Sequence, residues 1–196
     1  MLSTPGRIGV IAALPEELQS LLDAMPDAEP LQRAGRTFWV GHLQGRDIVA
    51  VLSRIGKVAA ATTTTVLLTE MACQQIIFTG VAGGLGADVR VGDVVVADAL
   101  LQHDMDASPL FPRHEVPGHG RARFDADLLL TEALELACER MLHSLPQRLG
   151  TSTVGTFGLQ APRLHQGLLI SGDRFVATTA ESAALQHELP DALAVE

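Results

Sequence analysis

The chain has 196 residues, enough for one domain with a sizeable hydrophobic core. Hydrophobic residues make up 47% of it and the mean hydropathy is +0.24, which argues against intrinsic disorder. The net charge of −9 argues against a nucleic-acid-binding or anionic-membrane-binding surface, because both need a basic patch. We therefore expect a single folded domain over residues 1–196, with neither nucleic acid nor a membrane as its partner.

The cysteines and the N-terminal residues indicate a cytoplasmic protein. Cys73 and Cys138 lie in segments with a helical pattern and form no CxxC motif, so we expect buried, reduced thiols. The apolar run at 8–14 is followed by Pro-Glu-Glu rather than by a small-residue cleavage site, which argues against an export signal. No uncharged apolar stretch approaches the length of a membrane span.

The first part of the chain alternates strand and helix patterns. An apolar run at 7–13 predicts a central strand, and Pro15 suits the first turn of the helix that follows. Alternating residues at 35–43 and 47–52 predict a hairpin. The alanine-rich segment 57–72 predicts a helix, although its four consecutive threonines weaken the prediction because β-branched side chains lose χ1 freedom in helices.

The central stretch, residues 75–98, has the arrangement of a ligand site. Buried strands are predicted at 76–78 and 94–97, and four glycines lie between them: Gly80, Gly83, Gly84 and Gly86. Glycines let the backbone turn sharply and approach a ligand. A small polar molecule is expected where such a loop lies at the carboxyl edge of a sheet. Alternatively the glycines only make tight turns, since the loop has neither a GxGxxG motif nor a Walker pattern.

The rest of the chain continues the alternation. Residues 100–120 are rich in Asp, His and Pro and predict a long loop, of the kind that is usually functional or disordered. The other predicted elements are a helix at 125–143, a connection at 151–162, a strand at 164–170, a helix at 179–189 and the start of a strand at 192–196. We predict a three-layer α/β/α fold with a mixed, mostly parallel central sheet.

Five sequence blocks occur in an order and spacing that are together more specific than any one of them. They are IGVIAALPEEL at 8–18, SRIGKVAAA at 53–61, TGVAGGL with VGDVV between 79 and 95, SGDRF at 171–175 and AVE at 194–196. These blocks resemble the 5′-methylthioadenosine/S-adenosylhomocysteine nucleosidases of the nucleoside phosphorylase superfamily. The resemblance implies hydrolysis of the N-glycosidic bond of a 5′-alkylthioadenosine to adenine and a thioribose. It also implies a small nucleoside substrate, no metal or organic cofactor, and a homodimer.

The chemistry requires a carboxylate that activates water, an acid for the departing purine and groups that fix the ribose. The sugar passes through an oxocarbenium-like state, as in glycoside hydrolysis. Glu17 matches the family's water-activating glutamate. It lies where phosphate-using relatives carry a phosphate loop, and an acidic turn there repels phosphate and favours water. On spacing alone, Glu17 could have no role beyond stabilising the first turn of a helix through the helix dipole.

The residues that match the family's substrate contacts come from several blocks. Phe175 matches the aromatic residue that stacks on adenine, and Val176 the residue whose backbone groups bond the purine edge. Without the resemblance, Phe175 is better interpreted as a core residue. The remaining matches line the sugar and its 5′ substituent: Ala82 and Gly83 in the glycine loop, Glu196 near the ribose, and Leu14 and Ile55 as an apolar wall.

The predicted loop at 100–120 contains the densest group of potential metal ligands: His103, Asp104 and Asp106. We do not expect a metal site, because zinc needs ligands that converge from separate elements and no obvious partners occur elsewhere. The resemblance implies instead that residues 100–117 lie at the dimer contact and reach the neighbouring active site. Arg113 and His114 would then be rim residues.

The chain departs from the family pattern in two places. Arg54 replaces a small residue and could face an anionic substrate group or phosphate, so a phosphorylase of the same fold stays an alternative. In the family, a Met-Glu pair that binds ribose and an aspartate general acid follow the Ala-Val-Glu block, and here they would lie beyond Glu196. We expect a piece of a longer enzyme without its last strand and helix, slowed by roughly 10²–10⁴-fold. If the natural gene ends at Glu196, a non-catalytic nucleoside-binding domain is the better interpretation.

Overall fold

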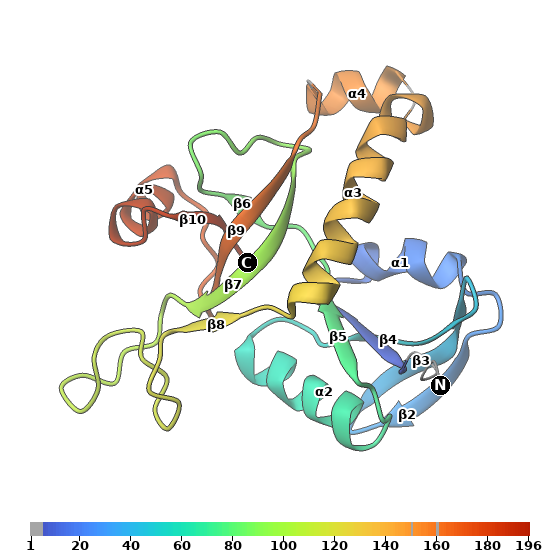
Figure 1. Ribbon diagram of the computed structural model, residues 1–196, viewed down its shortest axis with the longest axis horizontal. Helices are drawn as coiled ribbons and strands as arrows, with labels where there is room; N and C mark the ends of the chain where they lie inside the picture. Colours follow the sequence, from blue (N-terminus) through green and yellow to red (C-terminus); the bar gives the residue numbers. More distant parts are fainter. Residues whose placement is uncertain (1–5, 150, 160) are drawn as a thin grey trace. The chain divides into compact units, whose positions relative to one another are not determined.

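The structure, a computed structural model, describes residues 6–149, 151–159 and 161–196. The chain forms two compact units, Met1–Val81 and Ala82–Glu196 (Figure 1). The expectation of one domain over residues 1–196 stays a prediction. Among the described residues, no helix combines the length and the apolar character needed to cross a membrane.

The first unit is built on a five-stranded sheet with the strand order β2-β3-β4-β1-β5. Its strands are β1 (Ile8–Ala12), β2 (Glu29–Arg33), β3 (Arg36–Leu43), β4 (Arg46–Leu52) and β5 (Gln75–Phe78). β1 runs parallel to its neighbours β4 and β5, whereas β2, β3 and β4 pair antiparallel. The predicted interior strand and the predicted hairpin are confirmed. The sequence does not predict β2, because Leu31 is the only aliphatic side chain of its five residues apart from a proline.

The helix α1 (Pro15–Asp23) covers one face of this sheet (Figure 1). It begins with Pro15 at the first helical position, as predicted, where the missing N–H has no intrahelical partner to lose. Leu18 is fully buried and packs against Ala12 of β1 and Ala50 of β4. This packing fixes the start of α1 directly after the carboxyl end of β1.

The helix α2 (Lys57–Thr69) covers the opposite face. Leu67 belongs to the core cluster that contains Val49 and Val51, which alternate along β4 with the residue that contacts α1. The helix forms despite its run of threonines. Hydroxyl groups of four threonines in α2 donate to the backbone carbonyl four residues earlier, so these hydroxyls are satisfied inside the helix.

The second unit has its own five-stranded sheet, with the order β6-β10-β9-β7-β8. Its strands are β6 (Gly83–Gly84), β7 (Val94–Gln102), β8 (Arg123–Asp125), β9 (Leu164–Ser171) and β10 (Ala192–Val195). The three middle strands run parallel, and the two edge strands pair antiparallel with them. The predicted α/β class with mixed strand pairing is confirmed. The strands divide between two sheets, each with three parallel strands in succession.

Several predicted boundaries in this unit are wrong. The strand predicted at 94–97 continues to Gln102, so the loop predicted from residue 100 begins later. Asp98 hides this continuation because it interrupts the apolar run, at the point where the register of β7 against β9 shifts. The glycine loop contains the short strand β6, which apolar alternation cannot indicate because glycine has no side chain. The helix expected at 125–143 begins later, at Leu128, and Asp125 is the last residue of β8.

The helices of the second unit are α3 (Leu128–Arg148), α4 (Thr151–Phe157) and α5 (Thr179–Glu188). α3 is capped by Asp127, whose Oδ1 accepts a hydrogen bond from Leu130 N–H at 2.8 Å. α4 contradicts the connection predicted at 151–162, of which residue 160 lies outside the described residues. Threonine and glycine have low helix propensities, so this segment gave no helical signal. The predicted last helix and last strand are confirmed.

The two cysteines are free thiols. Cys73 is buried, as predicted, but it lies in the turn after α2 and not in a helix, because α2 ends at Thr69. Cys138 lies in α3, as predicted, but is only half-buried. Burial raises the pKa of the Cys73 thiol to about 11. Cys73 is therefore a structural thiol and a poor nucleophile at neutral pH.

Candidate active site

Three parallel strands of the first unit, β4, β1 and β5, end at the same edge of their sheet. The pairing continues one residue past each strand: Ser53 N–H donates to Ala12 O and Thr79 N–H donates to Ile11 O, both at 2.9 Å. Three predicted site residues follow these strands in the sequence. Leu14 lies between β1 and α1, Glu17 lies in the first turn of α1, and Ile55 lies between β4 and α2. The carboxyl edge of parallel strands is where open α/β sheets bind ligands.

The carboxylate of Glu17 is held at this edge by three backbone N–H groups. Its Oε2 accepts from Ala13 N–H at 3.0 Å and from Leu14 N–H at 2.9 Å, and its Oε1 accepts from Val81 N–H at 3.0 Å. The bond to Leu14 is the one expected of a glutamate that only starts a helix. The bond to Val81 spans 64 residues of sequence and ties the end of β5 to α1. Glu17 is therefore fixed more firmly than a helix cap requires.

Gly80 makes room for this carboxylate. A Cβ on residue 80 would lie 2.9 Å from Glu17 Oε1, closer than real Cβ atoms approach a heavy atom. This close approach gives one glycine of the 75–98 stretch a specific role. The alternative that the glycines only make turns does not account for it.

The apolar residues predicted at this edge are exposed. Leu14 is 43% exposed and Ile55 is 78% exposed. They follow β1 and β4, which are neighbours in the sheet. Exposed aliphatic side chains at a sheet edge can contact an apolar ligand group, but the contact itself stays a prediction.

Two arginines lie near the same edge, and the sequence reasoning identified only one of them. Arg54 has a φ of 71° and its guanidinium donates to Gly35 O at 3.3 Å, while the side chain stays exposed. Arg36 bonds Ser53 O at 3.3 Å and contacts α2 through Thr62 Oγ1 at 3.1 Å. Arg36 thus links the end of β4 to α2. It has no motif of its own, so only the structure identifies it. An anionic partner for Arg54 stays a prediction.

In the second unit, the glycine loop and the end of the chain lie side by side. Gly83 pairs with Val195 in the β6–β10 ladder, and a Cβ on Gly83 would lie 3.3 Å from Val195 Cγ1. Glu196 N–H donates to Ile170 O at 2.9 Å, and Glu196 Oε2 accepts from Ser171 Oγ at 3.4 Å. The structure therefore brings Gly83 and Glu196 together at the carboxyl ends of β10 and β9. Ala82, exposed, precedes them.

Phe175 and Val176 follow the carboxyl end of β9 in the same unit. Phe175 is 91% exposed, so its interpretation as a core residue is wrong. Val176 is half-buried and packs against the second unit's core, which contains Leu168, Ile170 and Val195. Among the described residues, no backbone–backbone hydrogen bond involves Val176, and a contact of its backbone with the purine edge stays a prediction.

Asp104 and Asp106, two of the potential metal ligands, bond other groups of the same chain. Asp104 Oδ2 accepts from Asp173 N–H at 2.8 Å, which ties the predicted loop to the end of β9. Asp106 Oδ1 accepts from Ser108 N–H at 3.0 Å and from the Ser108 hydroxyl at 2.5 Å. These bonds, that from the hydroxyl foremost, lower the pKa of Asp106. Within the described residues, no group of three or more His, Cys, Asp and Glu side chains is arranged to hold a metal ion.

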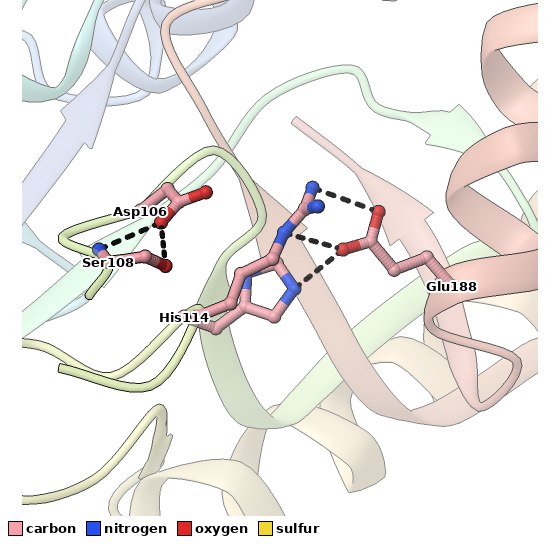
Figure 2. A network of polar contacts seen from close by, with 5 residues as sticks. Asp106, Ser108, His114 and Glu188 are labelled. Atoms are coloured by element: carbon pink, nitrogen blue, oxygen red, sulfur yellow. Dashed lines mark hydrogen bonds and ion pairs between the residues drawn. The ribbon is translucent and has the colours of Figure 1, made fainter.

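Arg113 and His114 contact the end of α5 in their own chain. Figure 2 shows the His114 ring directed at Glu188. Arg113 bonds the carboxylate through Nε at 2.9 Å and Nη2 at 3.1 Å, and His114 Nε2 lies 2.9 Å from Glu188 Oε1. A bidentate arginine pair of this kind has a defined geometry. It holds the loop against α5, whereas a role at the rim of a neighbouring active site stays a prediction.

The amino edge of the first unit carries a separate hollow of about 330 Å³, lined in part by Arg7, Asp27, His42 and Asp47. None of the predicted site residues lines it. His42 Nδ1 lies 2.7 Å from Asp27 Oδ2, and its Nε2 lies 3.1 Å from Asp47 Oδ1. The Asp27 hydrogen bond raises the pKa of His42. Both ring nitrogens have carboxylate partners, which indicates a structural cluster.

The Glu17 carboxylate in the first unit, and the glycine loop beside Glu196 in the second, each lie at the carboxyl edge of parallel strands, where α/β proteins bind small ligands. The family model of the Phosphorylase superfamily matches residues 7–196, and the chain belongs to this family. Its fold is that of the methylthioadenosine/S-adenosylhomocysteine nucleosidases. The enzyme of Neisseria meningitidis, solved with methylthio-immucillin-A, is 32% identical with a TM-score of 0.83. The match covers 97% of this chain and 75% of that one.

Two further solved nucleosidases show the same similarity. The enzyme of Colwellia psychrerythraea 34H, in complex with adenine, is 30% identical with a TM-score of 0.83 over 98% of this chain and 73% of that chain. The S-adenosylhomocysteine nucleosidase of Streptococcus pyogenes, in complex with 5-methylthiotubericidin, is 29% identical with a TM-score of 0.78. That match covers 100% of this chain and 75% of the other. The similarity in sequence blocks is thus matched by similarity in fold.

Proposed function

We propose that the protein hydrolyses the N-glycosidic bond of 5′-methylthioadenosine and S-adenosylhomocysteine-type nucleosides, releasing adenine and a thioribose. The observation that carries the proposal is the carboxylate of Glu17, oriented by the N–H groups of Ala13, Leu14 and Val81 at the carboxyl edge of a parallel sheet. The family membership and the nucleosidase fold support cleavage of an N-glycosidic bond. The tethered carboxylate supplies the group that such hydrolysis needs.

In the proposed mechanism, Glu17 accepts a proton from water as the water oxygen bonds to the anomeric carbon of the sugar. The carbon–nitrogen bond breaks at the same centre, through an oxocarbenium-like state, and its electron pair leaves with adenine, which takes a proton from solvent water. The three N–H groups hold the carboxylate in one orientation, so little reorganisation is needed when the water attacks. No metal or organic cofactor takes part in the proposal.

The proposed binding roles rest on the family resemblance, residue by residue. The exposed ring of Phe175 stacks on the base, and the backbone N–H and C=O of Val176 bond its edge. Glu196 and the Ala82-Gly83 backbone bind the ribose side. Leu14 and Ile55 contact the 5′-alkylthio group. We further propose a homodimer, on the basis of the sequence resemblance, and a cytoplasmic location, on the basis of the cysteines and the N-terminal residues.

The test is adenine release from 5′-methylthioadenosine by Glu17→Gln and by a matched control, Glu16→Gln. Both variants remove one charge from the first turn of α1, but only Glu17 bonds the ends of β1 and β5. We expect a loss of roughly 10²–10⁴-fold in kcat for E17Q and wild-type turnover for E16Q. The assay is run on the 196-residue chain and on the product of the full natural coding frame. Full activity of E17Q would remove Glu17 from the mechanism.

A further inference from the structure

The 174–178 loop carries Phe175 and Val176, yet its most exposed member has no packing to hold it. Phe175 is 91% exposed. At the start of the connection, Asp173 N–H donates to Asp104 Oδ2 at 2.8 Å, which anchors the backbone just before the loop. Val176 packs against the core. Other contacts must therefore fix the loop around Phe175.

A single carboxylate, that of Glu181 in the first turn of α5, contacts the loop on both sides of Phe175 and Val176. Its Oε1 accepts from Arg174 Nη2 at 3.0 Å. Its Oε2 accepts from Ala177 N–H at 3.3 Å, from Thr178 N–H at 3.1 Å and from the Thr178 hydroxyl at 2.9 Å. The Thr178 hydroxyl and these backbone groups hold the pKa of Glu181 below its usual range.

We propose that Glu181 is a positioning residue for adenine binding, acting through the 174–178 loop, an inference that rests on the proposed nucleosidase function. A helix cap alone needs only the contacts with Thr178. The additional bond to Arg174 closes the loop into a ring with Phe175 and Val176 at its centre. A base that stacks on Phe175 and bonds the backbone of Val176 needs both residues in a fixed relative position. Because Glu181 orders the loop before adenine binds, binding loses less conformational entropy.

The ion pair between Arg174 and Glu181 can be removed without changing the helix cap formed by Thr178 and Glu181. Arg174 is 73% exposed along its side chain, so Arg174→Ala leaves the core and α5 intact. Glu181→Ala removes the ion pair with Arg174, the bond from Ala177 N–H and the helix cap. The matched control is Asp127→Ala, which removes the N-terminal cap of α3 in the same unit, where Asp127 Oδ1 bonds Leu130 N–H outside the loop. All three variants are compared at a temperature well below unfolding.

The experiment measures the Kd of adenine by calorimetry and the kinetics with 5′-methylthioadenosine. We expect the Kd to rise about tenfold in E181A and about threefold in R174A, with D127A equal to wild type. The KM should rise with little change in kcat, because base contacts act equally in the ground and transition states. R174K, which keeps a cationic donor, should restore wild-type affinity. The double variant R174A/E181A should bind no more weakly than E181A, because one contact cannot be lost twice.

A second readout needs no ligand. Chymotrypsin cuts after exposed aromatic residues, and cleavage after Phe175 should be about threefold faster in R174A than in D127A, because the loop opens more often. Equal cleavage rates, equal adenine affinity in E181A and D127A, or additive effects of R174A and E181A would each overturn the inference. If wild-type protein binds no adenine, the proposed function fails, and the positioning role fails with it. If wild-type protein binds adenine but E181A and D127A bind it equally, only the positioning role fails, so the two failures are distinguishable.

Discussion

Replacing Gly80 by alanine tests whether the position of the Glu17 carboxylate matters. The new Cβ would lie 2.9 Å from Glu17 Oε1, 3.1 Å from Cδ and 3.2 Å from Oε2. No heavy atom tolerates the shortest of these contacts, so the carboxylate must move. The backbone at residue 80 does not have the positive φ that would strain an alanine, so the effect acts through this contact.

The movement weakens the bond from Val81 N–H to Glu17 Oε1, now 3.0 Å. A hydrogen bond to a charged group contributes about 1.5–3 kcal/mol, and misplacing a catalytic group by an ångström can cost about 100-fold in rate. We therefore expect kcat/KM for 5′-methylthioadenosine to fall about 10–100-fold in G80A. The affinity for adenine should not change, because its predicted contacts are with Phe175 and Val176.

Adenine release is followed in steady state, with Gly155→Ala as the matched control. A Cβ on Gly155 meets no heavy atom within 4 Å, so the same chemical change should leave the kinetics at wild-type values. Wild-type kcat/KM in G80A would refute the reasoning that a clamped carboxylate at this position activates water. Equal losses in G80A and G155A would point to a general effect of the substitution.

Two further predictions concern stability and thiol chemistry. Asp93→Asn should lower the free energy of unfolding by about 1–3 kcal/mol in urea titrations, because the buried carboxylate accepts from Arg163 N–H and His165 Nε2, both at 2.8 Å. Burial opposes ionisation of Asp93, but these bonds and one from Arg90 N–H outweigh it and lower its pKa, so the stabilisation is present above about pH 4 and disappears as the pH falls through the folded-state pKa. A difference between wild type and D93N that persists in strong acid would contradict this sign. Cys73, whose pKa burial raises to about 11, should react with a thiol reagent at pH 8 only on unfolding, and rapid reaction of the folded protein would contradict its burial.

The sequence predicted the position of Glu17 because its block combines a strand, a proline at a helix start and a glutamate in the first turn. It could not predict the bond to Val81, since that contact depends on β1 and β5 being neighbours in the sheet. The need for Gly80 follows from the same neighbourhood. The family resemblance thus identifies the catalytic candidate, local patterns place it at a helix start, and the sheet order supplies the groups that orient it.

The sequence contains a signal for the helix-capping role of Glu181 but none for its contact with Arg174. Thr178 and Glu181 have the spacing of a capping box, which marks the start of α5 in the sequence. Arg174, which makes the second contact of Glu181, belongs to no such motif, because a bond across a loop depends on how the loop folds. The long β7 strand was missed for a related reason, since Asp98 breaks the apolar pattern at a bulge that only the pairing with β9 reveals.

The identity of the nucleophile tests the account most directly. Wild-type protein is incubated with 5′-methylthioadenosine in phosphate-free buffer, and the products are separated and identified by mass spectrometry. The account predicts turnover without phosphate, with adenine and free methylthioribose in equal amounts. Turnover that begins only on addition of phosphate, with a sugar phosphate as the product, would contradict water activation by Glu17.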